Sequence, residues 1–88
     1  MEKSNATGIS LAGQRLRQWR MAQNPPISVG LAAHRLGVGQ ASLYGLETGA
    51  RTAGRKIMKA LVVAEICEVG DFFAPALPEV DGPQRRRA

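Results

Sequence analysis

The residues with the clearest chemical potential lie in the stretch QASLYGLET, which follows the sequence Gly-Val-Gly. In a helix over residues 40–48, the 3.6-residue period puts Gln40, Ala41, Tyr44 and Gly45 on one side. A second short helix over residues 29–36 lies before the glycines, so the pattern predicts two helices separated by a tight turn. The major groove of duplex DNA is wide enough to admit one helix. The spacing therefore predicts that the exposed side of the helix over residues 40–48 faces DNA.

Catalytic and metal chemistry have little support in the same sequence. A structural zinc site needs about four Cys or His ligands, whereas the chain offers only His34 and Cys67. No acid, base and nucleophile stand in a catalytic arrangement. We therefore expect no enzymatic activity, no metal ion and no cofactor.

Charge is distributed unevenly along the chain. Residues 1–59 carry nine basic and two acidic side chains, and residues 60–84 carry five acidic side chains and no Lys or Arg. Three further positive charges follow at Arg85, Arg86 and Arg87. Such asymmetry in a small protein suits a cationic surface that meets a polyanion, and nucleic acid is the leading candidate. On charge alone, a merely solvated basic surface is the alternative.

Neither a membrane segment nor a targeting signal is evident. The longest uncharged stretch, residues 21–34, contains two prolines and falls short of the roughly 20 apolar residues that a membrane span needs. The polar start lacks the pattern of a signal peptide, and a lone thiol fits a reducing compartment. We therefore expect a cytoplasmic protein without a membrane partner, associated with the nucleoid if it binds DNA.

The elements that must position these residues are all helical, because apolar residues recur at helical spacing and no segment alternates as a strand does. We expect a disordered segment over residues 1–8, one folded domain over residues 9–74, and a flexible, Pro-rich, Arg-terminated tail over residues 75–88. The expected helices cover residues 11–21, 29–36, 40–48 and 55–66, with a short turn over 69–73. Ser10 and Ser28 are placed to cap the first two helices, and glycines end the second and third.

Residues 32–49, AAHRLGVGQASLYGLETG, resemble the lambda-repressor-like family of phage repressors, Cro proteins and Xre-type regulators. The residues that carry the similarity, at the family's spacing, are Ala33, Leu36, Gly37, Val38, Gln40, Leu43, Leu46, Glu47 and Gly49. Weaker similarity covers residues 16–20 and 57–73. The resemblance implies an all-α, five-helix domain with a helix-turn-helix. It also implies a regulator of transcription, of the repressor type, that binds an operator in double-stranded DNA as a homodimer.

The resemblance assigns roles by position. Gln40 and Ala41 match residues that touch base edges, and Tyr44 is exposed beside them. A glutamine can pair with adenine through two hydrogen bonds, and an alanine methyl can touch a thymine methyl. Gly45 occupies a position where relatives often carry a longer base-contacting side chain, so we expect few base contacts there. The positions that match contacts to the DNA backbone are Arg17, Ser28, Val29, Ser42, Arg51 and Arg55.

Glu47 is the one acidic residue between Lys3 and Glu65. The helical pattern turns it inward, where an unpaired carboxylate would be costly. In similar proteins the matching glutamate pairs with an arginine at the end of the first helix, which here is Arg20. This pair is expected to be structural.

Two adjacent phenylalanines exceed what a short closing turn needs for its own core. We therefore expect Cys67, Val69, Phe72 and Phe73 to form the dimer contact, with DNA half-sites about 34 Å apart.

Two other interpretations stay open. An antitoxin-like or partner-binding module would bind DNA and also fold its C-terminal tail on a partner protein. A nonspecific architectural DNA binder would lose affinity steeply with salt and would vary little with DNA sequence.

Overall fold

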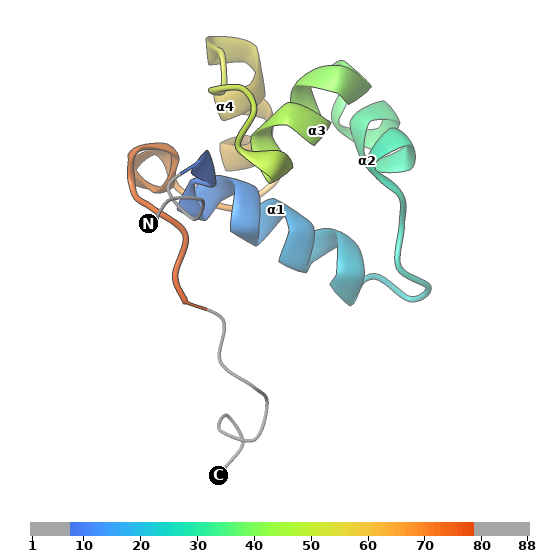
Figure 1. Ribbon diagram of the computed structural model, residues 1–88. Helices are drawn as coiled ribbons and strands as arrows, with labels where there is room; N and C mark the ends of the chain where they lie inside the picture. Colours follow the sequence, from blue (N-terminus) through green and yellow to red (C-terminus); the bar gives the residue numbers. More distant parts are fainter. Residues whose placement is uncertain (1–7, 79–88) are drawn as a thin grey trace, which may run out of the picture.

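The computed structural model describes residues 8–78, which fold into α-helices and a 3-10 helix without a β-strand in that range (Figure 1). In chain order the elements are α1 (Leu11–Ala22), α2 (Val29–Leu36), α3 (Gln40–Thr48), α4 (Arg55–Val63) and the 3-10 helix η2 (Val69–Phe73). The predicted all-α class is confirmed. The bounds of α2, α3 and η2 agree with the prediction, whereas α1 extends one residue further and α4 ends three residues earlier.

The helix ends follow from local chemistry. Ser10 Oγ accepts a hydrogen bond from the Gly13 N–H at 3.1 Å, and Ser28 Oγ accepts one from the Leu31 N–H at 3.1 Å. Both serines thus satisfy N–H groups that lack a partner within their own helix, as predicted. Gly37 and Gly49 end α2 and α3 with φ of 73° and 84°, a left-handed conformation that glycine adopts without a steric penalty.

The early end of α4 corrects the expected boundary at Ile66. The apolar stripe continues to Ile66, but Glu65 takes a left-handed conformation with φ of 63°, which turns the chain. The Ile66 N–H then bonds to the Leu61 carbonyl at 3.0 Å. Ile66 is still buried. The periodicity therefore predicted correctly that Ile66 is a core residue, but Ile66 lies in a turn after α4 and not in the helix.

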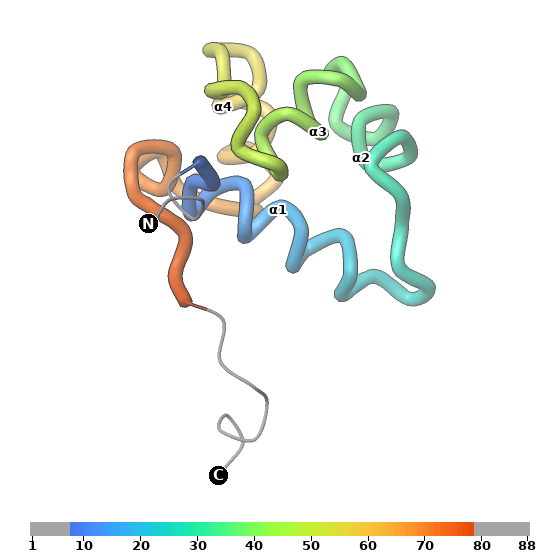
Figure 2. Tube along the Cα trace, in the orientation of Figure 1, coloured from blue at the N-terminus to red at the C-terminus, as the bar shows by residue number. Residues whose placement is uncertain are grey.

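The core lies where α1 passes beneath α3. Leu16 of α1, Leu43 of α3 and Leu61 of α4 are its largest fully buried side chains, and α2 packs along α3 (Figures 1 and 2). Helices α1 and α3 approach so closely at Gly13 that a Cβ on this residue would lie 2.4 Å from the Leu46 carbonyl oxygen. The contact therefore requires a residue without a side chain, and it fixes the distance of α3 from α1.

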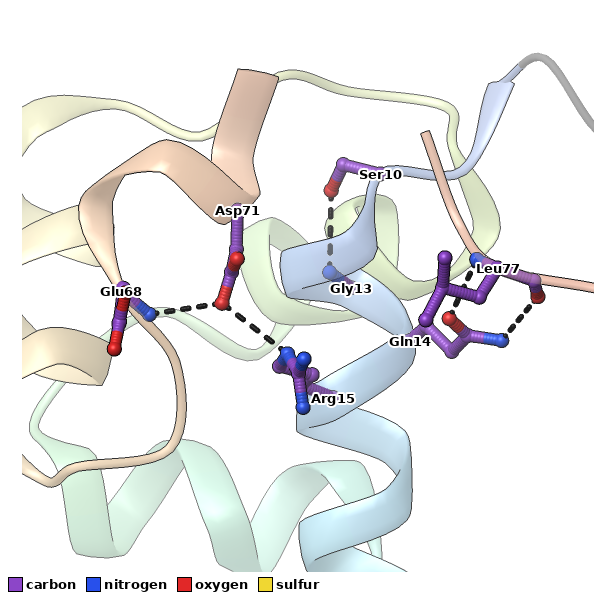
Figure 3. A network of polar contacts seen from close by, with 7 residues as sticks. All are labelled: Ser10, Gly13, Gln14, Arg15, Glu68, Asp71 and Leu77. Carbon is purple, nitrogen blue, oxygen red and sulfur yellow. Dashed lines mark hydrogen bonds and ion pairs between the residues drawn. The ribbon is translucent and has the colours of Figure 1, made fainter. Parts of the chain in front are cut away.

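The folded part extends beyond the predicted boundary at residue 74. Ser10 and Pro75 form an antiparallel β-bridge, and the Gln14 side chain both accepts from the Leu77 N–H at 2.8 Å and donates to the Leu77 carbonyl at 2.7 Å (Figure 3). Residues 75–78 thus lie along the start of α1 (Figure 2). The prolines and the loss of helical periodicity after residue 74 correctly indicated that no helix follows, but they could not reveal that residues 75–78 pair with the backbone before α1. Of the segment predicted over residues 1–8, residues 1–7 lie outside the described residues, as do residues 79–88 of the tail, with Arg85, Arg86 and Arg87.

None of the helices in residues 8–78 combines the length and the apolar character required to cross a bilayer.

Candidate nucleic-acid interface

Helix α3 is held on its inner side and open on its outer side. Leu43 and Leu46 are buried against the core, whereas Gln40 and Ala41 are exposed and Tyr44 is 60% exposed. Three of the four residues predicted to contact bases therefore share an exposed side of one helix. Because the inner side is anchored by buried leucines, the outer side is presented by a fixed scaffold.

Gly45, the fourth predicted base-contacting residue, lies in α3 but is buried. The side chain of Arg51, in the loop between α3 and α4, covers it: a Cβ on Gly45 would lie 2.7–2.9 Å from the Arg51 Cβ, Cγ and Cδ. The Arg51 N–H also bonds to the Gly45 carbonyl at 3.2 Å. The missing side chain makes room for the loop to fold back over α3. Helical spacing alone could not reveal this cover.

The start of α3 lies beside the start of α2. A Cβ on Gly30 would lie 3.2 Å from Gln40 Oε1, so the Gln40 carboxamide rests alongside the first turn of α2. Ser28, the N-cap of α2, is exposed. Val29, predicted to contact the DNA backbone, is partly buried, and its side chain packs against the core. Ser42, also predicted as a backbone contact, is half-buried in α3.

Exposed cations surround the α2–α3 pair. Arg17 of α1, Arg51 and Arg55 are all exposed, as predicted for phosphate contacts. Lys56 is exposed next to Arg55 at the start of α4. Sequence reasoning missed Lys56, although the signal was available: α4 follows Gly54 without a side-chain cap, and its first turn contains no acidic residue. Two cations at a helix N-terminus oppose the helix dipole, and a bound anion would relieve that repulsion.

Apart from Glu47, the acidic residues within 8–78 lie after α4. Glu65, Glu68 and Asp71 follow α4, and Asp71 lies in η2, where its Oδ2 is 3.2 Å from Arg15 Nε (Figure 3). In Figure 1 η2, in orange, lies at the left and α2, in blue-green, at the right, with α3 between them. Within residues 8–78, the acidic Asp71 of η2 therefore lies away from α2.

The predicted pair of Arg20 and Glu47 is confirmed. Arg20 Nε donates to Glu47 Oε2 and Arg20 Nη2 to Glu47 Oε1, both at 2.6 Å. The third nitrogen, Nη1, donates to the Ile27 carbonyl at 2.8 Å. Hydrogen bonding to Glu47 raises the pKa of Arg20 above its ordinary value. One guanidinium therefore joins the end of α1, the end of α3 and the segment that leads into α2.

The four residues predicted for the dimer contact separate into two groups. Cys67 is buried in the core, where burial, followed by the charge of Asp71, raises the pKa of its thiol to about 11. Phe72 is half-buried and packs against the same core. By contrast, Val69 is 56% and Phe73 75% exposed. Cys67 is therefore corrected to a core residue and Phe72 to a residue that packs on the core, and of the four predicted residues only Val69 and Phe73 are exposed.

In the part of the chain that the structure describes, no three His, Cys, Asp or Glu side chains are grouped so that they could hold a metal ion. Comparison with known proteins gives no match: no family model, no curated protein and no solved structure is significantly similar to the chain. The interpretation of the site therefore depends on its own geometry.

Proposed function

We propose that the protein is a sequence-specific regulator of transcription that binds double-stranded DNA in the manner of lambda-repressor-like proteins. In this proposal α2 and α3 form a helix-turn-helix, and α3 enters the major groove. The observation that carries the proposal is the division of α3 into a buried side, with Leu43 and Leu46, and an exposed side with Gln40, Ala41 and Tyr44. A glutamine and an alanine in this place can recognise adenine and a thymine methyl.

The charges around α3 support a duplex over a neutral partner. Arg17, Arg51 and Arg55 are exposed, and the first turns of α2 and α4 present N–H groups that favour phosphate. Contacts of this kind set the register of a protein on DNA, while contacts to base edges supply specificity. Each phosphate that is neutralised also releases counterions, so the affinity should fall as salt is raised.

The regulator acts, in this proposal, as a homodimer that occupies an operator and represses transcription. Val69 and Phe73 are exposed on η2, and a two-fold contact between two copies would cover both residues at once. Two copies of α3 would then meet half-sites about 34 Å apart. A symmetric site of this spacing is the expected DNA partner.

Selection of binding sites from random double-stranded DNA tests the proposal, followed by affinity measurements on the selected sequence. We expect one enriched, symmetric sequence. Because good base contacts each contribute about 1–3 kcal/mol, the double variant Gln40→Ala/Tyr44→Ala should bind this site at least tenfold more weakly. Gln18→Ala is the matched control, since Gln18 is an exposed glutamine on α1.

The opposite outcomes are equally clear. If no sequence is enriched while affinity falls steeply with salt, the protein is a nonspecific architectural binder. If the unaltered protein does not bind duplex DNA, or if Gln40→Ala/Tyr44→Ala leaves the affinity unchanged, α3 is not the contact surface and the proposal is wrong.

A further inference from the structure

Gly45 and Arg51 lie in contact with each other and are not among the hydrophobic residues that form the core cluster. Gly45 lies in the middle of α3, one residue after the exposed Tyr44, and Arg51 follows α3 in the loop that leads to α4. The stem of Arg51 covers Gly45, while Arg51 as a whole is exposed. The stem of Arg51, a loop residue, thus fills the space on α3 that a side chain at position 45 would fill.

We propose that Arg51 is a specificity-determining residue that contacts a guanine in the place of the side chain that Gly45 lacks. This inference rests on the DNA-binding function proposed above and deepens it. It changes the role expected for Arg51, from a contact to the DNA backbone to a contact with a base.

The position of the stem is the first argument. Three consecutive carbons of Arg51, Cβ, Cγ and Cδ, lie 2.7–2.9 Å from the place where a Cβ of residue 45 would be. The guanidinium therefore starts from the same point of α3 from which a long side chain at position 45 would reach outward. The Arg51 N–H bond to the Gly45 carbonyl, at 3.2 Å, fastens the loop there. A side chain that is already held in place loses less conformational freedom on binding.

The chemistry of arginine is the second argument. Its planar guanidinium presents paired donors that match O6 and N7 of guanine, the most frequent specific contact in the major groove. A phosphate contact by the same side chain would carry no sequence information. We therefore expect a G·C pair in the selected site, next to the bases that Gln40 and Ala41 contact.

Mutual exclusion provides the test, because a side chain at position 45 and the stem of Arg51 cannot occupy the same space. Gly45→Ala should displace the stem and weaken binding to the selected site at least tenfold, although alanine favours the helix. Arg51→Ala should weaken binding to a similar extent and remove the preference at one base pair. In the Arg51→Ala background, Gly45→Ala should have little further effect, so the two losses should not add.

Three further measurements separate a base contact from an effect of charge or of folding. Arg51→Lys keeps the charge but not the paired donors, so it should also lose the preference for guanine. Arg15→Ala removes one positive charge from α1, where Arg15 pairs with Asp71 of η2, and should leave the preference for every base pair intact. Thermal unfolding of Gly45→Ala should be as cooperative as that of the unaltered protein, which separates loss of contact from loss of fold.

The inference is overturned if Arg51→Ala weakens binding equally on all sequences and Arg51→Lys restores it, since that pattern describes a phosphate contact. It is also overturned if Gly45→Ala and Arg51→Ala weaken binding independently, or not at all, while the unaltered protein selects a site. Failure of the unaltered protein to bind any duplex is a different result, because it removes the proposed function itself and this inference with it.

Discussion

The pair of Arg20 and Glu47 allows a quantitative test of how α3 is held. The side chains of Arg20 and Glu47 are only 12% and 7% exposed, and two hydrogen bonds of 2.6 Å join them. Removal of one partner leaves the other charge buried, at a cost of about 3–5 kcal/mol. This is a large fraction of the 5–15 kcal/mol, roughly, that stabilises a typical domain. We therefore expect Glu47→Leu to unfold at least about 12 °C below the unaltered protein.

The double variant Arg20→Met/Glu47→Leu separates the charge effect from packing. It leaves no buried charge, so its free energy of unfolding should exceed that of either single variant. The double variant still loses the hydrogen bond of 2.8 Å that Arg20 Nη1 donates to the Ile27 carbonyl. Leaving this carbonyl without a donor costs about 1–3 kcal/mol. The double variant should therefore fall between the single variants and the unaltered protein in urea-induced unfolding.

A surface pair provides the control for this experiment. Arg15, with a side chain 44% exposed, lies 3.2 Å from Asp71, and removal of such a pair costs about 0–1 kcal/mol. Arg15→Ala should thus change the unfolding midpoint little. If Glu47→Leu proves as mild as Arg15→Ala, or if the losses of the two single variants simply add in the double variant, the buried pair does not hold α3 and our reasoning about its energy fails.

Three further predictions concern the scaffold. Gly13→Ala should lower the free energy of unfolding by about 1–3 kcal/mol, because its Cβ would meet the Leu46 carbonyl at 2.4 Å; a stabilised variant would contradict the close approach of α1 and α3. Deletion of residues 75–88 should lower the melting temperature more than deletion of residues 79–88, since Ala76 and Leu77 hydrogen-bond to Ile9 and Gln14; equal melting temperatures would place the boundary at residue 74. Cys67, with a pKa of about 11, should react with iodoacetamide at pH 7 at least roughly a hundredfold more slowly than the unfolded chain, and equal rates would show an accessible thiolate.

The sequence was sufficient wherever the determining interaction is local or leaves a charge without a partner. Ser10 and Ser28 cap the helices that follow them, as the identity of each residue indicated. Glu47 was recognisable because an inward carboxylate requires a cation, and the structure supplies Arg20. In each case the physical cost of leaving a donor or a charge unsatisfied restricts the choice of structure.

The sequence was insufficient where a loop or a terminal segment folds back on a helix. Periodicity assigned Gly45 to the outer side of α3, but no pattern in the helix shows that Arg51 lies over it. The pairing of residues 75–78 with α1 likewise depends on backbone groups that every sequence possesses. Such contacts depend on the tertiary structure as a whole, and the types of the two residues in contact do not reveal them.

The attachments of α3 explain why binding and stability can be tested separately. Gly13 sets its distance from α1, and Glu47 ties its end to Arg20. Neither residue belongs to the exposed side, where Ala41 and Tyr44 lie. Surface substitutions away from such attachments usually change stability by less than about 0.5 kcal/mol. A loss of DNA affinity in Tyr44→Ala, with an unchanged unfolding midpoint, would therefore identify a lost contact and not a disturbed helix. A parallel loss of stability would show that the outer side of α3 is also part of the scaffold.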